Sequence, residues 1–418
     1  MKLTLLLENN IIEEKEVEPK ILAQLLFCNI IVVMQGTYNT QKAIIWLCLA
    51  HLIVDVYSGF LNPIMPFIAE KLQFSMATAT VIISISHICS SMLQPIFGFF
   101  ADNILKRFFI FWGLILASVF VPLTPVVTTI PLLLVCMILG SIGNSFFHPQ
   151  SIGFVNYFSG KDCANNMGVF ISLGSFGFAL GPLLAAYITQ ILGLDKILYT
   201  SLFGLILAFL MFFFVPKLSK YEEQPRKKSF LVSFKEILSN KQINYLMLIS
   251  MMKTLVTNSC CILLPFLWKS IGHTPFYIGL SLFLFVFLGS IASLLSPKAE
   301  RLWGAKTILY ISMCATLPQI IIFALIYKSH PVLSMVIFGL IGFTTMLAQP
   351  VTLVLAQKAL PQYRSIIAGF INGFCWGIIA LCLSILGSFA QNFGIINVLI
   401  FLSIIPVICS KYVSFIKE

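Results

Sequence analysis

Two ionisable side chains lie deep inside long apolar stretches. Asp55 belongs to the apolar segment that begins near residue 43, and Lys253 belongs to the one that begins near residue 243. At 1.5 Å per residue, Asp55 lies about 18 Å and Lys253 about 15 Å from the start of its segment, close to mid-membrane if the segments are helices. A charge at that depth costs about 2.5–3.5 kcal/mol, so it normally faces a cavity or a partner. The positions indicate a polar path for a charged species.

Two histidines accompany these groups. His51 precedes Asp55 by one helical turn on the same face, so it could assist Asp55 in binding a proton. Asn144 and His148 are also one turn apart, and either side chain could bond the backbone carbonyl that Pro149 frees. Because histidine changes charge near neutral pH, His148 is either a second titratable group or a structural histidine. Other polar residues that could line the same path are Asn62, Gln94, Asn258 and Asn372.

The composition excludes a soluble protein. Hydrophobic residues make up 59% and charged residues only 10% of the 418 positions. The eleven cysteines lie mostly in apolar segments, with no CxxC pair and no metal-ligand spacing, so we expect reduced packing residues, no metal site and no cofactor. Twelve segments are long enough to span a bilayer, at about 43–67, 78–101, 108–128, 131–157, 166–191, 196–216, 243–268, 276–297, 306–327, 331–357, 366–390 and 394–413.

The net charge of +11 orients such a chain in the membrane and does not indicate nucleic-acid binding. If the segments alternate, most lysines and arginines fall on one side, and only Lys71, Lys196, Lys269 and Lys328 fall on the other. The richer side is then the cytoplasm, and twelve spans put both termini there.

Four sequence features recur 196 to 201 residues apart. The pairs are Pro66-Phe67 with Pro265-Phe266, Asp102 and its following basic residues with Glu300 and its own, Pro149 with Pro350, and Gly177/Gly181 with Gly373/Gly377. This pattern predicts an all-α membrane protein of twelve transmembrane helices in two parallel-repeat six-helix bundles, with the substrate path between them. Asp55 and Lys253 would then face one central cavity at similar depth, as a pair or separately. The alternative is that Asp55 bonds only His51 and that Lys253 extends toward the membrane surface.

The repeat divides the chain into four parts. Residues 1–42 form an N-terminal extension that is amphipathic or disordered, with translation from Met34 as the alternative, because its apolar run is too short to span a membrane. Residues 43–216 form the first bundle and 243–418 the second. Residues 217–242 form a cytoplasmic linker with one surface helix near 230–238.

A stripe of small residues marks the fifth span. Gly177, Gly181 and Ala185 recur every fourth residue, and a neighbouring helix can pack directly against such a stripe. Pro182 stands beside it. The stripe alone is compatible with generic packing of membrane helices. Gly-x3-Gly-Pro followed by small residues is nevertheless similar to the antiporter motif in the fifth span of drug–proton exchangers of the major facilitator superfamily.

The loop after the second span also resembles that superfamily. It places Gly98, Asp102, Lys106 and Arg107 at the spacing of the signature cytoplasmic loop, although Asn103 and Leu105 replace the usual basic residue and glycine. We expect these residues to stabilise one conformation of a transporter and not to touch its substrate. A simple stop-transfer cluster of charges is the alternative.

Four stretches together resemble the fosmidomycin-resistance branch of the superfamily: His51–Asp55, Ser90–Asp102, Phe147–Pro149 and Leu180–Ala186. The resemblance implies a monomeric inner-membrane efflux protein that exchanges a small drug-like or anionic compound for protons by alternating access. It implies that Asp55, assisted by His51, couples to protons, and that Lys253 contributes positive charge to the cavity. Gln150 and Gly153 depart from the pattern, as do the residues that precede Lys253.

Two other functions fit part of the sequence. The same fold could carry out proton-linked uptake of a small organic acid or a metal chelate, with Lys253 binding the carboxylate. A membrane-embedded acyl- or glycosyltransferase is disfavoured, because the familiar acyltransferase pair needs one more residue between histidine and aspartate than His51 and Asp55 have. No second catalytic cluster accompanies that pair, so we expect no enzyme.

Overall fold

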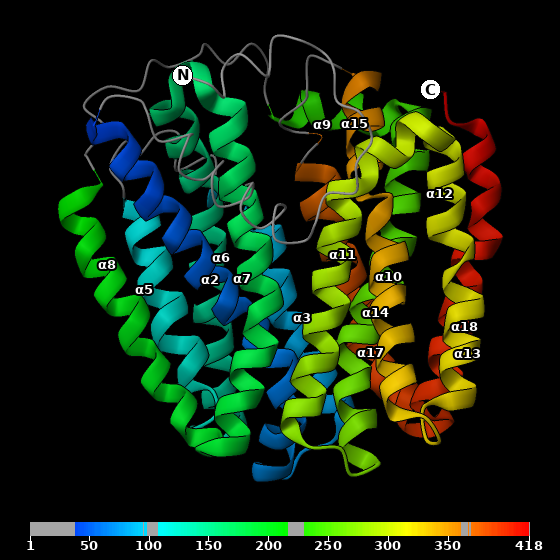
Figure 1. Ribbon diagram of the computed structural model, residues 1–418, viewed down its shortest axis with the longest axis horizontal. Coiled ribbons are helices and arrows are strands. Elements are labelled where there is room, and N and C mark those ends of the chain that lie inside the picture. Colours follow the sequence, from blue (N-terminus) through cyan, green and yellow to red (C-terminus); the bar gives the residue numbers. More distant parts are fainter. Residues whose placement is uncertain are drawn as a thin grey trace, which may run out of the picture.

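The computed structural model describes residues 38–94, 96–97, 108–215, 230–360, 367 and 369–417, whose regular elements are all helices (Figure 1). The predicted loop residues Gly98, Asp102, Lys106 and Arg107 lie outside this part of the chain, as do residues 1–37. Ten helices of the described part are long and apolar enough to cross a membrane, and two apolar helices of intermediate length accompany them. These helices match the twelve predicted spans.

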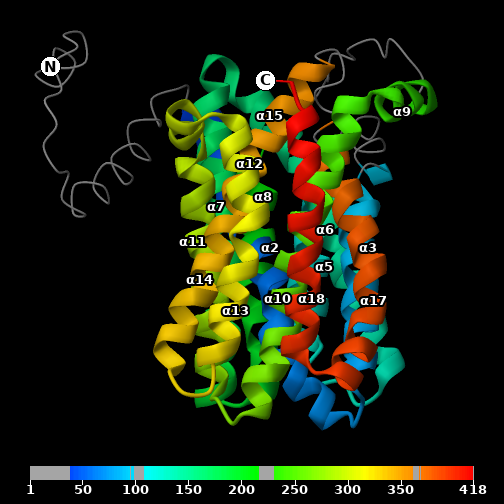
Figure 2. The same ribbon diagram turned by 90° about the vertical axis from the view of Figure 1, so that its right-hand side faces the viewer.

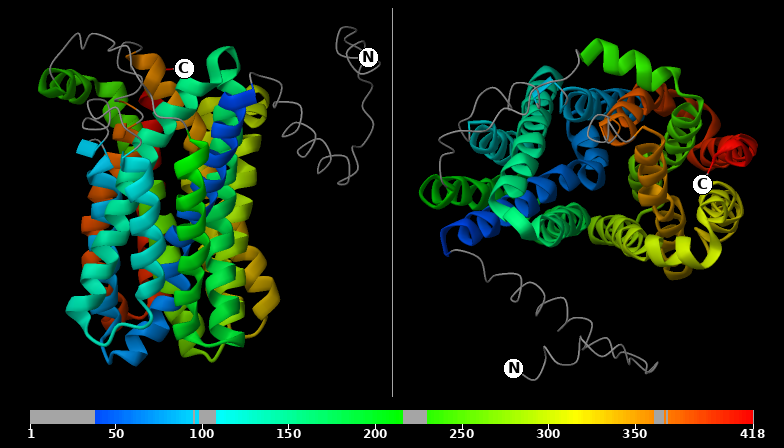
Figure 3. Two further views of the ribbon diagram at one scale, coloured as in Figure 1. Left: turned by 90° about the vertical axis from the view of Figure 1, so that its left-hand side faces the viewer. Right: turned by 90° about the horizontal axis from the view of Figure 1, so that it is seen from above.

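The helices fall into two groups that lie side by side (Figures 1 and 3). The first group contains α2 (Tyr38–Lys71), α3 (Met76–Met92), α5 (Phe108–Leu123), α6 (Ile130–Ser159), α7 (Cys163–Ile191) and α8 (Ser201–Phe214). The second contains α10 (Lys241–Ser270), α11 (Pro275–Trp303), α12 (Ala305–Cys314), α13 (Thr316–Ile326), α14 (Pro331–Leu347), α15 (Gln349–Ala359), α17 (Cys375–Phe393) and α18 (Ile395–Cys409). The surface helix expected in the connection is present as α9 (Phe230–Ser239).

Several helices begin where the sequence supplies a side-chain cap. The hydroxyl oxygens of Ser75, Thr129 and Thr274 and the amide oxygen of Asn240 accept hydrogen bonds from backbone N–H groups in the first turns of α3, α6, α11 and α10. Such caps satisfy donors that a helix leaves free at its start. A proline in the first turn of α6 and α11 adds no cost, because an N–H at that position has no partner within the helix.

Three spans of the second group are interrupted, although the sequence led us to expect continuous helices. The ninth span breaks at Ala315, between α12 and α13, and the tenth breaks at Ala348, between α14 and α15. Pro350 follows the second break and cannot donate the backbone hydrogen bond that would continue α14. The eleventh span begins with a π-helical turn at Phe370–Phe374, ahead of α17. Interruptions of this kind often lie at functional sites in membrane proteins.

The two groups meet along equivalent helices. α3 packs on α17, and α7 packs on α11, so spans 2 and 11 form one contact and spans 5 and 8 form the other. α2 and α10, the first and seventh spans, also touch. These pairings are what a two-fold repeat requires, because exchanging the halves converts each contact into the other (Figure 2).

The glycine stripe of α7 packs backbone to backbone against α2. A Cβ atom added at Gly177 would overlap the Leu52 carbonyl, and one added at Gly181 would overlap the Val56 carbonyl. Gly59 of α2 lies equally close to α7, since a Cβ at Gly59 would lie 2.7 Å from Pro182 Cδ. The stripe therefore joins the first and fifth spans at closer range than larger side chains allow.

The groups are also joined at the end of the bundle opposite α9. Lys269, near the end of α10, forms an ion pair with Glu70 of α2 and donates to the Pro66 carbonyl oxygen over 2.8 Å. Close by, the side-chain oxygen of Gln190 on α7 accepts from the backbone N–H of Phe276 on α11 at 3.0 Å. These bonds hold the two groups together at that end.

Candidate functional site

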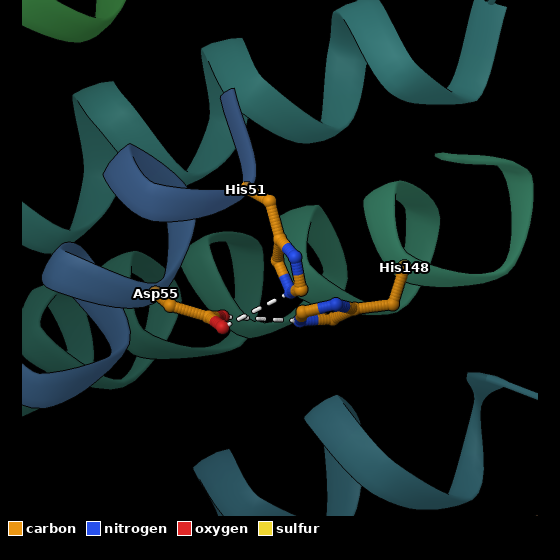
Figure 4. Close-up of side chains that lie close together, drawn as sticks. All are labelled: His51, Asp55 and His148. Carbon is orange, nitrogen blue, oxygen red and sulfur yellow. Dashed lines mark ion pairs between the residues drawn. The ribbon is translucent and has the colours of Figure 1, made fainter. Parts of the chain in front are cut away.

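Three titratable side chains meet inside the first group of helices, and we call them the His–Asp cluster: His51 and Asp55 on α2, and His148 on α6 (Figure 4). His51 Nε2 lies 3.1 Å from Asp55 Oδ2, and His148 Nε2 lies 3.3 Å from Asp55 Oδ1. Their side chains are 9%, 14% and 18% exposed for His51, Asp55 and His148. The carboxylate is therefore held between two imidazoles in a largely buried setting.

A backbone carbonyl fixes the orientation of His51. Its Nδ1 lies 2.8 Å from the carbonyl oxygen of Phe170 on α7, and its ring stacks on the Phe170 ring with centroids 4.0 Å apart. Since a carbonyl oxygen only accepts hydrogen bonds, Nδ1 carries the hydrogen. In a neutral imidazole, Nε2 would then present a lone pair to the Asp55 carboxylate, which also only accepts. The 3.1 Å contact therefore requires one more proton, either on Nε2 or on the carboxyl group.

Gly174 of α7 provides the space for this pair. A Cβ atom added at Gly174 would overlap the His51 imidazole and lie 2.7 Å from Asp55 Oδ2. Gly174 lies one turn before Gly177 on the face of α7 that packs against α2. The stripe predicted from the sequence begins at Gly177, and Gly174, three residues earlier, extends the same face.

Replacing Gly174 with alanine should impair transport more than it destabilises the protein. The added methyl group meets the far end of His51, which can rotate away at the cost of its bonds to Phe170 and Asp55. The matched control is Gly168→Ala on the same helix, where a Cβ has no neighbour within 4 Å. Gly177→Ala should destabilise the protein more than it impairs transport. Its methyl group would meet the backbone of α2, which lowers the free energy of unfolding by about 1–3 kcal/mol.

Apparent melting temperature in detergent and transport in liposomes separate these effects. A Gly174→Ala protein that transports like Gly168→Ala would show that His51 needs no such room.

Lys253 lies in the second group, where it is 5% exposed. Its Nζ donates to Thr352 Oγ1 over 3.2 Å, and Thr352 lies on α15, just past the break in the tenth span. Among the residues that the structure describes, no carboxylate forms an ion pair with Lys253. The small cavity beside it is lined by Ser250, Lys253, Thr254, Thr257, Thr345, Met346, Gln349 and Trp376.

This environment is polar but not anionic. A buried ammonium group without a counter-charge is unfavourable unless a ligand supplies that charge. Lys253 does not extend toward the membrane surface, which was the alternative drawn from the sequence. No ion pair joins Lys253 to Asp55 either, because the partners of Asp55 are the two histidines.

The other polar residues from the sequence analysis lie in several places. Asn144 donates from Nδ2 to Ser58 Oγ over 2.8 Å, and His148 contacts Asp55, so each side chain has a partner other than the carbonyl that Pro149 could free. Gln94, just past the end of α3, donates from Nε2 to the carbonyl oxygen of Ser90. Asn258 is buried, and its amide nitrogen has no partner among the described residues. Asn62 is half-buried on α2, and the side chain of Asn372 lies outside the described part.

Several neighbours of the site were not foreseen from the sequence. The Phe170 carbonyl and Gly174 lie against the His–Asp cluster, Ser58 bonds Asn144, and Thr352 and Trp376 lie beside Lys253. Each comes from a different helix from the residue that it contacts. Only Gly174 had a sequence signal, its position beside the glycine stripe.

Comparison with known proteins agrees with this architecture. Residues 47–385 match the Major Facilitator Superfamily. The fosmidomycin resistance protein of Escherichia coli is 26% identical over 361 residues, which cover 83% of this chain and 86% of that protein. An uncharacterized MFS-type transporter of Bacillus subtilis, YfnC, is 21% identical over 378 residues, 87% of this chain and 90% of its own.

Among solved structures, a bacterial homolog of the human lysosomal transporter Spinster, in an inward-facing and occupied conformation, aligns with a TM-score of 0.72 at 12% identity. That alignment covers 91% of this chain and 97% of the other. It confirms the predicted fold of twelve membrane helices. Because the superfamily matches most of its length, this chain belongs to the Major Facilitator Superfamily, and it is a multi-pass membrane protein that acts as a secondary transporter, not an enzyme.

Proposed function

We propose that this transporter exports a small anionic or drug-like compound in exchange for protons, by alternating access. The single observation that carries the proposal is the 3.1 Å contact between His51 Nε2 and Asp55 Oδ2, which needs a proton that His51 Nδ1 cannot supply. A buried site that must hold a proton is suited to accept one from one side of the membrane and release it to the other.

Lys253 supports the anionic part of the proposal. Its charge is buried in the second group of helices, whereas the His–Asp cluster belongs to the first. A compound with a carboxylate or a similar group would supply the missing counter-charge, and the ring of Trp376 would offer it an apolar surface. Exchange results if the proton and the substrate favour opposite states of the transporter.

The orientation of the protein follows the positive-inside rule. Among the described residues, most lysines and arginines of the connections belong to the end of the bundle that carries α9. We therefore place this end, and both termini, on the cytoplasmic side of an inner membrane. In this orientation Lys269, Glu70, Gln190 and Phe276 close the outer end. That closure supports a form in which substrate reaches Lys253 from the cytoplasm.

One chain supplies both halves of the proposed path, residues 43–216 and 243–418 joined by a linker at 217–242, so we propose that the monomer is the transporting unit. Rocking of these halves about their contacts would alternate access. Aromatic and polar groups around the cavity are compatible with several related substrates, as in multidrug efflux.

Transport in inverted membrane vesicles tests the direction and the coupling. Energised inverted vesicles that hold the protein, with a pH-sensitive dye inside, are given candidate organic acids and drugs one at a time. We expect a substrate to release protons from the lumen, which reports exchange. Proton-linked accumulation of the same compound by intact cells would instead establish uptake, the alternative drawn from the sequence.

A further inference from the structure

We infer that the His–Asp cluster also binds a divalent transition-metal ion of the zinc type, and that this ion inhibits transport. The inhibition rests on the proposed function, because the ion occupies the atoms that we assign to the proton. The binding rests on the geometry of the three side chains alone.

The three side chains offer a set of atoms that suits a zinc ion. Two imidazole nitrogens and one carboxylate oxygen lie within 4.8 Å of one another. Zinc bonds nitrogen and oxygen ligands at about 2.0–2.2 Å, so the ligands of a tetrahedral zinc ion lie roughly 3.3–3.5 Å apart. His51 Nε2 lies 3.1 Å from Asp55 Oδ2 and His148 Nε2 lies 3.3 Å from Asp55 Oδ1, so each imidazole is already at about that distance from one carboxylate oxygen. Figure 4 shows both rings directed at the carboxylate. Small side-chain rotations would bring both ring nitrogens and one carboxylate oxygen to the spacing of zinc ligands.

The surroundings of His51 also resemble those of a metal-binding histidine. A histidine that binds a metal usually donates its other ring N–H to a carbonyl or carboxylate, which fixes the ring and directs the free lone pair at the ion. The Phe170 carbonyl already does this for His51 Nδ1 at 2.8 Å. The absence of a side chain at Gly174 lets His51 Nε2 and Asp55 Oδ2 come together in this position, because a Cβ there would overlap the imidazole.

The same ligands decide which ions fit. Imidazole nitrogens suit zinc, nickel and copper, whereas magnesium and calcium prefer sites built from oxygen. Three protein ligands leave a fourth position for water, as in open zinc sites. Because all three ligands belong to α2 and α6 of one group, the ion would not tie the two groups together. It would act only by occupying the cluster.

Direct binding tests the site without any transport measurement. The purified full-length protein in detergent is titrated with Zn²⁺ by calorimetry, with Mg²⁺ as the control ion and Co²⁺ as a spectroscopic substitute. We expect one Zn²⁺ per chain, no comparable Mg²⁺ binding, and a visible absorption band from bound Co²⁺. His51→Gln and His148→Gln should each weaken Zn²⁺ binding by about 100-fold or more, since even the loss of an outer partner costs 10–100-fold.

The matched control is His87→Gln, which removes a histidine of α3 that is not part of the cluster, so it should bind Zn²⁺ like the parent protein. Size-exclusion profiles show whether each variant is folded. If a cluster variant does not fold, loss of the Co²⁺ band from the parent protein when Zn²⁺ is added gives an independent measure. Equal Zn²⁺ binding by the cluster variants and the control, or no stoichiometric binding by the parent protein, would overturn the proposed site.

Transport measurements then separate the two proposals. If Zn²⁺ binds and inhibits the parent protein and His87→Gln alike, the inference stands. If Zn²⁺ binds but pH-driven transport continues when Asp55 is replaced, the proposed function fails while the metal site survives. If Zn²⁺ does not bind but the Asp55 variant loses coupling, the metal site fails and the function survives.

Discussion

Replacing Asp55 with asparagine should reduce transport driven by a pH gradient to the level of protein-free liposomes. The amide has nearly the shape of the carboxylate but does not bind a proton at neutral pH, so the extra proton between His51 and residue 55 loses its site. Exchange of labelled for unlabelled substrate needs no net proton movement and should persist. Comparing the two assays in the same liposomes measures the loss of coupling.

The control for this experiment is Asp195→Asn. Asp195 is exposed and forms an ion pair with Lys71 at 2.6 Å. It lies in the connection between α7 and α8 and is not part of the His–Asp cluster. Its replacement should leave both assays unchanged, because an exposed ion pair contributes about 0–1 kcal/mol. Normal pH-driven transport by the Asp55 variant would refute a role for the cluster in coupling.

Replacing Lys253 with methionine should weaken the binding of an anionic substrate by about tenfold to a hundredfold. A hydrogen bond to a charged group is worth about 1.5–3 kcal/mol, and each 1.4 kcal/mol is tenfold in affinity. The same change should raise the apparent melting temperature in the absence of substrate, because it removes a buried charge that has no acidic partner among the described residues. Substrate binding by scintillation proximity and thermal unfolding in detergent provide the two measurements.

Lys196→Met serves as the control for Lys253. Its ammonium group lies over the ring of Tyr199 at the end of the bundle opposite α9, and the side chain is exposed. It should change neither the affinity nor the melting temperature. If Lys253→Met bound the anion as tightly as Lys196→Met, Lys253 would have no part in recognition.

The sequence was informative wherever the signal is local. Apolar length located the spans, and the spacing of His51 and Asp55 predicted their contact, because both depend on one helix alone. The glycine stripe of α7 predicted a close neighbour for the same reason, although it did not identify α2 as that neighbour.

Contacts between helices could not be predicted from the sequence in the same way. His148 reaches Asp55 only because α6 turns that face toward α2, and this rotation depends on packing along the whole length of both helices. Thr352 of α15 meets Lys253 of α10 just past the break in the tenth span. Pro350 is visible in the sequence, but many membrane helices contain proline without breaking. The position of the break therefore needed the structure.

The ion pair of Glu70 with Lys269 has a consequence for the energy of switching. Glu70 is 68% exposed, and ion pairs in such settings contribute about 0–1 kcal/mol. Parting these two charges is thus a minor barrier, and dissolved salt would lower it further. Full conversion between two states requires a ligand to prefer one of them by about 5.5 kcal/mol. Because the ion pair contributes so little free energy, most of the ligand's preference for one state is available to rearrange the apolar surfaces between the halves.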